Sequence, residues 1–127
     1  MELIINDKIY KIGKPKMSTL LKNIASYGKQ FINISIYKFK IEKISKSEID
    51  SICDGGDLII TNDLPFDNSM QINIIKNYEL HRKTIISDLG GGLHSVVFEI
   101  TYDNKYELSE QKYKQIKRKI TLNNILA

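Results

Sequence analysis

The fold is decided by the stretch LGGGLHSVVFEITYDNKYELSEQKYKQIKRK, residues Leu89–Lys119. Three glycines come near its start, and the β-branched and aromatic residues of Ser95–Tyr102 then predict a strand. Asp103–Lys105 predicts a turn, Tyr106–Leu108 a short strand, and Ser109 the N-cap of a basic helix. Strand, turn, strand and helix in direct succession indicate an α+β fold. No motif in this stretch specifies a chemistry.

The N-terminal part predicts a hairpin followed by a helix. Glu2–Ile5 and Lys8–Ile12 are apolar-rich runs joined by Asn6-Asp7, a pair that tolerates a tight turn. Lys16–Tyr27 then predicts a helix that packs on the hairpin, with a glycine, Gly28, at its C-terminal end. The expectation rests on apolar residues at helical spacing, namely Leu20, Leu21, Ile24 and Tyr27.

Phe31–Lys43 predicts a long strand. The phase of its apolar residues changes near Ile36–Tyr37, so either both faces are covered or a bulge turns the strand there.

A short helix is predicted after this strand. Ser45 and Glu48 have the spacing of a capping box, and Ile44 and Ile49 that of a hydrophobic staple. Gly55-Gly56 ends the helix.

The middle of the chain predicts further strands. Asp57–Thr61 predicts one, and Asn62–Asp67 a loop. Met70–Leu80 fits either a strand or a helix, and its β-branched residues favour a strand. Lys83–Ser87 predicts another short strand. The expected fold is a single α+β domain over residues 1–127, mostly antiparallel sheet with two or three helices packed on one face.

Composition limits the classes of protein. The chain has 127 residues, of which 42% are hydrophobic and 27% charged, as in an ordinary globular domain. No apolar run approaches the roughly 18 residues of a membrane span, so we expect a cytoplasmic protein without a membrane partner. The one cysteine, Cys53, excludes an internal disulfide. Abundant isoleucine, lysine and asparagine suggest an AT-rich bacterial or phage genome.

The charges are unevenly distributed along the chain. Residues 1–46 carry a net charge of +7, residues 47–111 carry −8, and residues 112–127 hold five bases and no acid. Such asymmetry can support polyanion binding. The alternative is that the two signs interleave in the fold and only a solvated surface remains.

Two features could serve catalysis or phosphate binding. Gly90–Gly92 could cradle a phosphate, but a strand follows it and no Gly-Lys-Ser/Thr is present, so a flexible connection is the simpler interpretation. His81 and His94 could act as base and acid, yet nothing in their spacing brings them together.

Carboxylates crowd around the strand predicted at Asp57–Thr61. Asp54, Asp57, Asp63 and Asp67 could hold a divalent metal, although the same residues also form good turns. Because no motif specifies a cofactor or a metal, we expect none. Cys53 is expected to be a small core residue.

The basic helix is the strongest candidate for a functional surface. It could lie along a phosphate backbone or an acidic protein, or it could simply be solvated. The candidate binding residues are Lys112, Tyr113, Lys114, Lys117, Arg118 and Lys119.

Three functions are compatible with these observations. The first is a small non-enzymatic protein, of the inhibitor or immunity type, that caps another macromolecule, most simply another protein. The alternative is a nucleic-acid-binding protein that uses the basic helix. The second alternative is a small metal-dependent hydrolase that uses Asp63, Asp67 and His94. The oligomeric state stays open, because the sequence does not show which strand edge is free.

Overall fold

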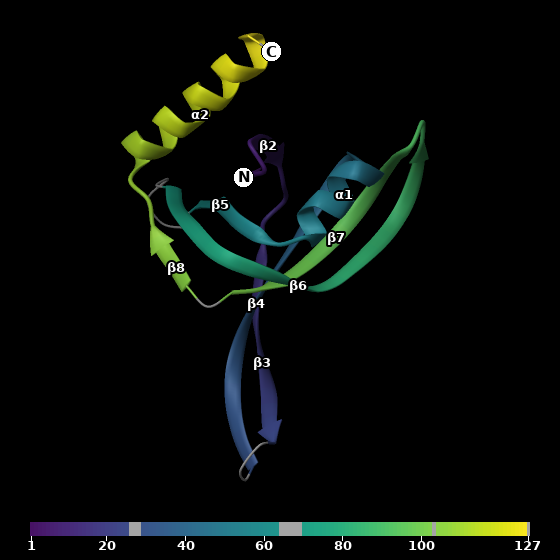
Figure 1. Ribbon diagram of the computed structural model, residues 1–127, viewed down its shortest axis with the longest axis vertical. Helices are drawn as coiled ribbons and strands as arrows, with labels where there is room; N and C mark the ends of the chain where they lie inside the picture. Colours follow the sequence, from purple (N-terminus) through teal and green to yellow (C-terminus); the bar gives the residue numbers. More distant parts are fainter. Residues whose placement is uncertain (26–28, 64–69, 103, 127) are drawn as a thin grey trace.

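The computed structural model describes residues 1–25, 29–63, 70–102 and 104–126. These residues form eight strands and two helices (Figure 1). The strands make one open sheet of order β2-β1-β5-β6-β7-β4-β3, in which β8 also pairs with β6. Every strand pairing described is antiparallel. The elements are β1 (Glu2–Ile5), β2 (Lys8–Lys11), β3 (Lys16–Ala25), β4 (Lys29–Ser45), α1 (Lys46–Cys53), β5 (Gly56–Asp63), β6 (Met70–Gly90), β7 (Leu93–Thr101), β8 (Asn104–Glu107) and α2 (Glu110–Leu126).

The long strand β6 joins the two halves of the sheet. Its residues 70–78 pair with β5 and β8, and its residues 79–90 pair with β7. Irregular pairing at Asn77 (φ 52°) and a bulge at Lys43 (φ 58°) in β4 bend the sheet around a core. The hairpin of β3 and β4 extends to one end of the molecule, and β6 with β7 rises beside α1 (Figure 1).

The main core lies on the inner side of this bent sheet. Helix α1 packs on it through Ile49 and Ile52, which are 2% and 1% exposed. The other buried members come from β1, β4, β5, β6, β7 and the segment after β2: Leu3, Ile5, Ile12, Tyr37, Phe39, Ile41, Ile44, Leu58, Ile60, Ile75, Tyr78, Val96, Phe98 and Ile100.

Helix α2 covers the opposite face of the sheet. In β1, Leu3 and Ile5 belong to the main core, whereas Ile4 belongs to a second apolar cluster. Successive strand residues point to opposite faces, so α1 and α2 lie on different sides. The second cluster holds Ile4, Ile59, Ile72, Leu108, Tyr113 and Ile120.

The predicted fold class is therefore wrong. The sheet is mostly antiparallel as expected, but the two described helices do not pack on one face, and strand residues far outnumber helix residues in the described part of the chain. The reason is that β1 and β5 carry consecutive apolar residues, which need cover on both sides.

The helix predicted at Lys16–Tyr27 is also wrong. Residues Lys16–Ala25 form β3, which pairs with β4 at ten consecutive positions. The continuous ladder with the long strand β4 overrides the helical spacing of the apolar residues. The expected C-terminal glycine, Gly28, lies outside the described residues.

Several local predictions are confirmed. Asn6 and Asp7 form the tight turn between β1 and β2, with φ of 52° and 57°. Met70–Leu80 is strand, although it continues through the segment Lys83–Ser87 as one strand, β6. The irregularity in β4 lies between Ile41 and Ile44 and not near Ile36–Tyr37.

Gly55 provides a test of this architecture. Its φ is +85°, and a Cβ there would lie 2.8 Å from the backbone oxygen of Tyr78. We expect Gly55→Ala to lower the free energy of unfolding by about 1–3 kcal/mol, because backbone atoms must shift and the new residue is strained. Urea denaturation measures the change.

Gly13→Ala is the matched control, because a Cβ at Gly13 meets nothing within 4 Å. We expect its free energy of unfolding to stay within about 0.5 kcal/mol of the parent value. Equal stability of the two variants would contradict the close packing of Gly55 on Tyr78.

Candidate functional site

Beside the apolar contacts of the second cluster, one carboxylate links the predicted basic helix to the sheet. Ser109 caps α2 by accepting a hydrogen bond from the Lys112 backbone N–H at 3.2 Å, as predicted. Lys117 Nζ lies 2.8 Å from Glu2 Oε2, and the buried Tyr113 hydroxyl donates to the same oxygen at 3.3 Å. The hydrogen bond from Lys117 holds the pKa of Glu2 below its ordinary value. These contacts join α2 to β1.

The six candidate residues of this helix therefore separate into two groups. Tyr113 and Lys117 bind Glu2, and Lys114 pairs with Glu110 at 3.3 Å. Lys112, Arg118 and Lys119 are exposed, with no ion pair to another described residue. These three exposed cations are therefore available to a partner. The candidate tyrosine, Tyr113, is buried and is not.

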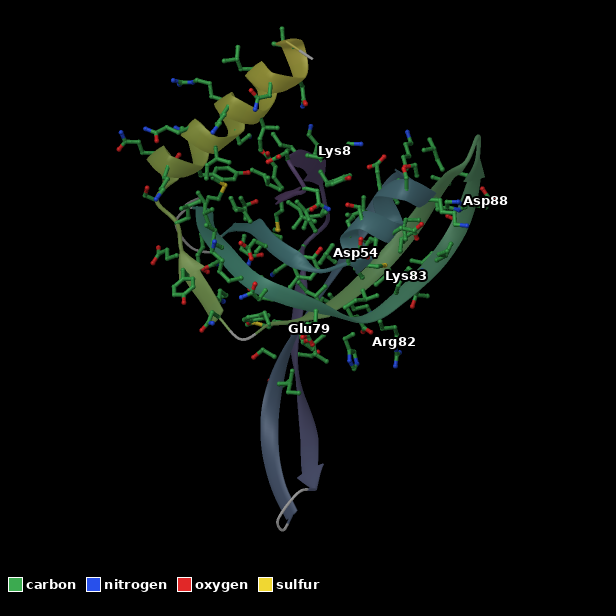
Figure 2. The ribbon with its side chains drawn as sticks, in the orientation of Figure 1. Lys8, Asp54, Glu79, Arg82, Lys83 and Asp88 are labelled. Atoms are coloured by element: carbon green, nitrogen blue, oxygen red, sulfur yellow. The ribbon has the colours of Figure 1, made fainter. Side chains whose placement is uncertain are left out.

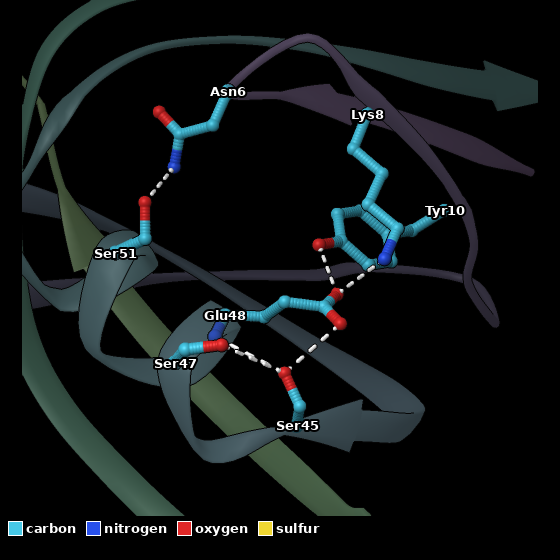
Figure 3. A network of polar contacts seen from close by, with 7 residues as sticks. All are labelled: Asn6, Lys8, Tyr10, Ser45, Ser47, Glu48 and Ser51. Atoms are coloured by element: carbon cyan, nitrogen blue, oxygen red, sulfur yellow. Dashed lines mark hydrogen bonds and ion pairs between the residues drawn. The ribbon is translucent and has the colours of Figure 1, made fainter. Parts of the chain in front are cut away.

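A second carboxylate, Glu48, binds α1 to β2 (Figure 3). It accepts hydrogen bonds from Lys8 Nζ at 2.8 Å, the Tyr10 hydroxyl at 2.6 Å and Ser45 Oγ at 3.0 Å. Burial opposes its ionisation, but these donors outweigh burial and lower the pKa of Glu48. Ser45 Oγ also accepts from the Glu48 backbone N–H at 3.3 Å, which confirms the predicted cap. Because the three donors come from β2 and from the residue that caps α1, the Glu48 cluster stabilises the contact between these elements.

The four carboxylates proposed as metal ligands are not brought together among the described side chains, and Asp54 is exposed, with no hydrogen bond or ion pair from its carboxylate to another described residue. Asp57 accepts from the Asn77 backbone N–H at 2.9 Å and from Lys76 at 3.1 Å, and the bond from Asn77 lowers the pKa of Asp57. Asp67 lies outside the described residues, as does the side chain of Asp63. Among the described side chains, no three potential ligands gather as a metal site would require.

The glycines and histidines are distributed along one hairpin. Gly90–Gly92 all have positive φ and turn the chain between β6 and β7, with the Gly90 N–H donating to Asp88 at 3.0 Å. His94 Nδ1 lies 4.0 Å from Asp88 Oδ1. His81 is exposed further along β6, roughly 15–20 Å away at about 3.3 Å per strand residue. The two histidines do not share a site. Burial raises the pKa of the Cys53 thiol, which packs against the main core.

The surface that sequence reasoning missed is the hairpin of residues 79–101, which we call the β6–β7 arm. Three aliphatic side chains on it, Ile85, Ile86 and Leu89, are 52%, 54% and 50% exposed. Residues 79–90 pair with β7 along one edge, and within the described chain no strand pairs with their other edge. The adjacent isoleucines before a glycine turn were the available signal. Their exposure depends on β6 continuing past β5, which no local pattern indicates.

Comparison with known proteins identifies a fold. The solved structure of Hcp1 from Flavobacterium johnsoniae superposes with a TM-score of 0.56 over 84% of this chain and 92% of that chain, at 11% sequence identity. At this identity the likeness shows a similar fold alone. No known protein family and no curated protein sequence matches the chain. Neither described helix has the length and apolarity to cross a membrane.

If the Glu2 contacts help to hold α2 on the sheet, loss of the Glu2 charge should lower the stability of the protein. Glu2→Gln removes the charge that Lys117 and Tyr113 approach, and we expect the free energy of unfolding to fall by about 0.5–1 kcal/mol. The effect is small because the Glu2 and Lys117 side chains are 32% and 34% exposed and solvent screens the pair. Glu42→Gln is the control, since the Glu42 side chain is 68% exposed in its pair with Lys40. An equal loss in both variants would contradict a specific role for Glu2.

Acid should weaken the fold in a defined direction. The folded-state pKa values of Glu2, Glu48 and Asp57 all lie below their ordinary values. The stability that each contributes is present above its unfolded-state pKa, 4.5 for glutamate, and is lost as the pH falls through the folded-state value. Urea denaturation from pH 6 to pH 3 should therefore show falling stability, with a shallower fall for Glu2→Gln. An unchanged slope in that variant would contradict the assignment.

Proposed function

We propose that this protein acts by binding another protein, in the manner of an inhibitor or immunity protein that caps its target, and that the β6–β7 arm makes the contact. The observation that carries the proposal is the group of half-exposed aliphatic side chains on a strand whose outer edge has no described partner.

Exposed single aliphatic residues are ordinary on protein surfaces, whereas a group beside an open strand edge favours recognition. Ile85, Ile86 and Leu89 fall within five residues. Ile85 lies opposite the buried Val96, whereas Ile86 lines the outer face with Thr84 and Val97, so exposed aliphatic side chains stand on both faces of the open-edged strand. The backbone of residues 79–90 has N–H and C=O groups that can pair with an added strand, and alternate side chains can then supply specificity. Backbone pairing and aliphatic burial together give a partner both affinity and register.

The proposal is supported further by the roles of the polar clusters. Glu2, Glu48 and Asp57 are each bound by donors that hold elements of the fold together. A protein whose described carboxylate clusters serve structure and whose apolar surface is exposed is better suited to binding than to turnover.

The test compares an arm variant with a control variant in pull-downs from the native host, with and without nuclease. We expect the parent protein to recover one protein in stoichiometric amount after nuclease treatment, and Ile85→Ser with Leu89→Ser to weaken its affinity at least about tenfold. The affinity is then measured with the purified partner. Both side chains are about half exposed, so the variant should remain folded.

Leu122→Ser with Ile125→Ser is the matched control, because it removes two exposed aliphatic side chains from α2. It should bind the partner as the parent does. Equal loss in the two variants, recovery of nucleic acid alone, or turnover of a defined substrate by the pure protein would overturn the proposal.

A further inference from the structure

The outer face of the sheet, across the β6–β7 arm and the neighbouring strands β4 and β3, carries a row of charged side chains from four strands. Lys16 of β3 lies opposite Lys38 of β4, Lys38 opposite Glu99 of β7, and Glu99 opposite Arg82 of β6. With strands about 4.8 Å apart, this row spans roughly 15 Å. Figure 2 shows Arg82 on the side of β6 away from α1 and Lys83 on the side of α1.

The next row on the same face is less polar. Lys40 lies opposite Val97, and Val97 lies opposite Thr84. Val97 is half-buried and belongs to neither apolar cluster of the described core, although it stands at the centre of three strands. Ile86 lines the same face. The two rows therefore place an aliphatic centre beside cations.

Two adjoining hollows follow this arrangement. One, of about 230 Å³, is lined by Lys14, Lys16, Lys38, Lys40 and Val97 among others. The second has the same volume and is lined by Lys38, Arg82, Thr84, Ile86, Val97 and Glu99. Both hollows are bordered by Lys38 and Val97, and we call the surface that contains them the outer groove.

Positive charge in the outer groove is largely uncompensated. Arg82 Nε lies 3.5 Å from Glu99 Oε2, and Lys40 lies 3.4 Å from Glu42. Lys14, Lys16 and Lys38 are exposed and have no ion pair with any other described side chain. The N-terminal excess of lysine thus gathers in part around one groove, where an acidic partner would gain most.

We propose that the outer groove binds an acidic protein segment in which an aliphatic side chain is flanked by carboxylates. The aliphatic side chain lies over Val97, and the flanking carboxylates meet Lys38 and Lys40, which stand two residues apart on β4 beside Val97, with Lys16 of β3 next to Lys38. This inference deepens the proposed function by naming the chemistry of the partner, and it rests on that function only for the partner being a protein.

The face favours a protein segment over a nucleic acid. No exposed aromatic side chain lines either hollow, so the groove has no ring on which a base could stack. Phe39, which lines the first hollow, is 2% exposed and belongs to the main core. A nucleic acid also has no branched aliphatic side chain to place over Val97.

The test uses a short peptide of alternating glutamate and isoleucine with blocked ends, titrated into ¹⁵N-labelled protein at low and moderate salt. We expect the largest amide shift changes at Val97, Lys38 and Lys40, and weaker binding at the higher salt. Lys38→Gln with Lys40→Gln should lower the affinity for the peptide about tenfold, whereas Lys38→Arg with Lys40→Arg should leave the affinity unchanged.

Lys112→Gln with Lys119→Gln is the matched control, since it removes two exposed cations from α2, and it should bind within about twofold of the parent. Equal weakening by the control, tighter binding of the glutamine-for-glutamate peptide, or tighter binding of oligothymidylate would each overturn the inference. Self-association of the chain through this groove, detected by sedimentation and lost in Lys38→Gln with Lys40→Gln, would also overturn the stated partner.

The arm variant separates this inference from the proposed function. Ile85→Ser with Leu89→Ser should bind the acidic peptide normally, because neither side chain lines the outer groove. If the peptide fails to bind while the arm still captures its protein partner, the groove inference alone is wrong.

Discussion

The bend of β6 at Asn77 and Tyr78 is the constraint on which the rest of the structure depends. Asn77 adopts φ 52° while its backbone N–H donates to Asp57, and the buried Tyr78 hydroxyl donates to the Ile52 carbonyl at 2.7 Å. Burial raises the pKa of Tyr78 to about 12, so its hydroxyl keeps its proton and remains a donor. These bonds join β6 to β5 and α1 where the strand passes from one half of the sheet to the other.

Local signals in the sequence predicted local structure well. The Asn6-Asp7 turn and the Ser45 cap depend on residues within a few positions of one another, and both are found as expected. The segment Lys16–Tyr27 was wrongly predicted as a helix because its partner strand, β4, decides its structure through a long ladder. Consecutive apolar residues in β1 and β5 were the overlooked signal for helices on both faces.

The candidate site was predicted only in part, because its geometry depends on distant residues. The sequence identified the cations of α2 as a set, but it did not indicate which of them pair with a carboxylate and which are exposed. Glu2 lies 111 residues from Tyr113 and 115 from Lys117, and no spacing rule connects residues so far apart. The exposed aliphatic residues of the β6–β7 arm likewise depend on strand pairing that the sequence does not display.

The register of the sheet determines where the unevenly distributed charges of the chain lie in the fold. Each carboxylate that stabilises the fold, namely Glu2, Glu48 and Asp57, is contacted by a lysine, so part of the acidic charge is neutralised where elements meet. Lys38 and Lys40 of β4 instead face outward beside β7, where Glu99 lies opposite Lys38, and Lys16 of β3 lies next to Lys38. These ion pairs take up acids and lysines in equal number, so positive charge remains on other surfaces, among them the exposed face of α2 and the outer face of the sheet. The outer groove is such a surface, and the aliphatic side chain of Ile86 places it in continuity with the β6–β7 arm.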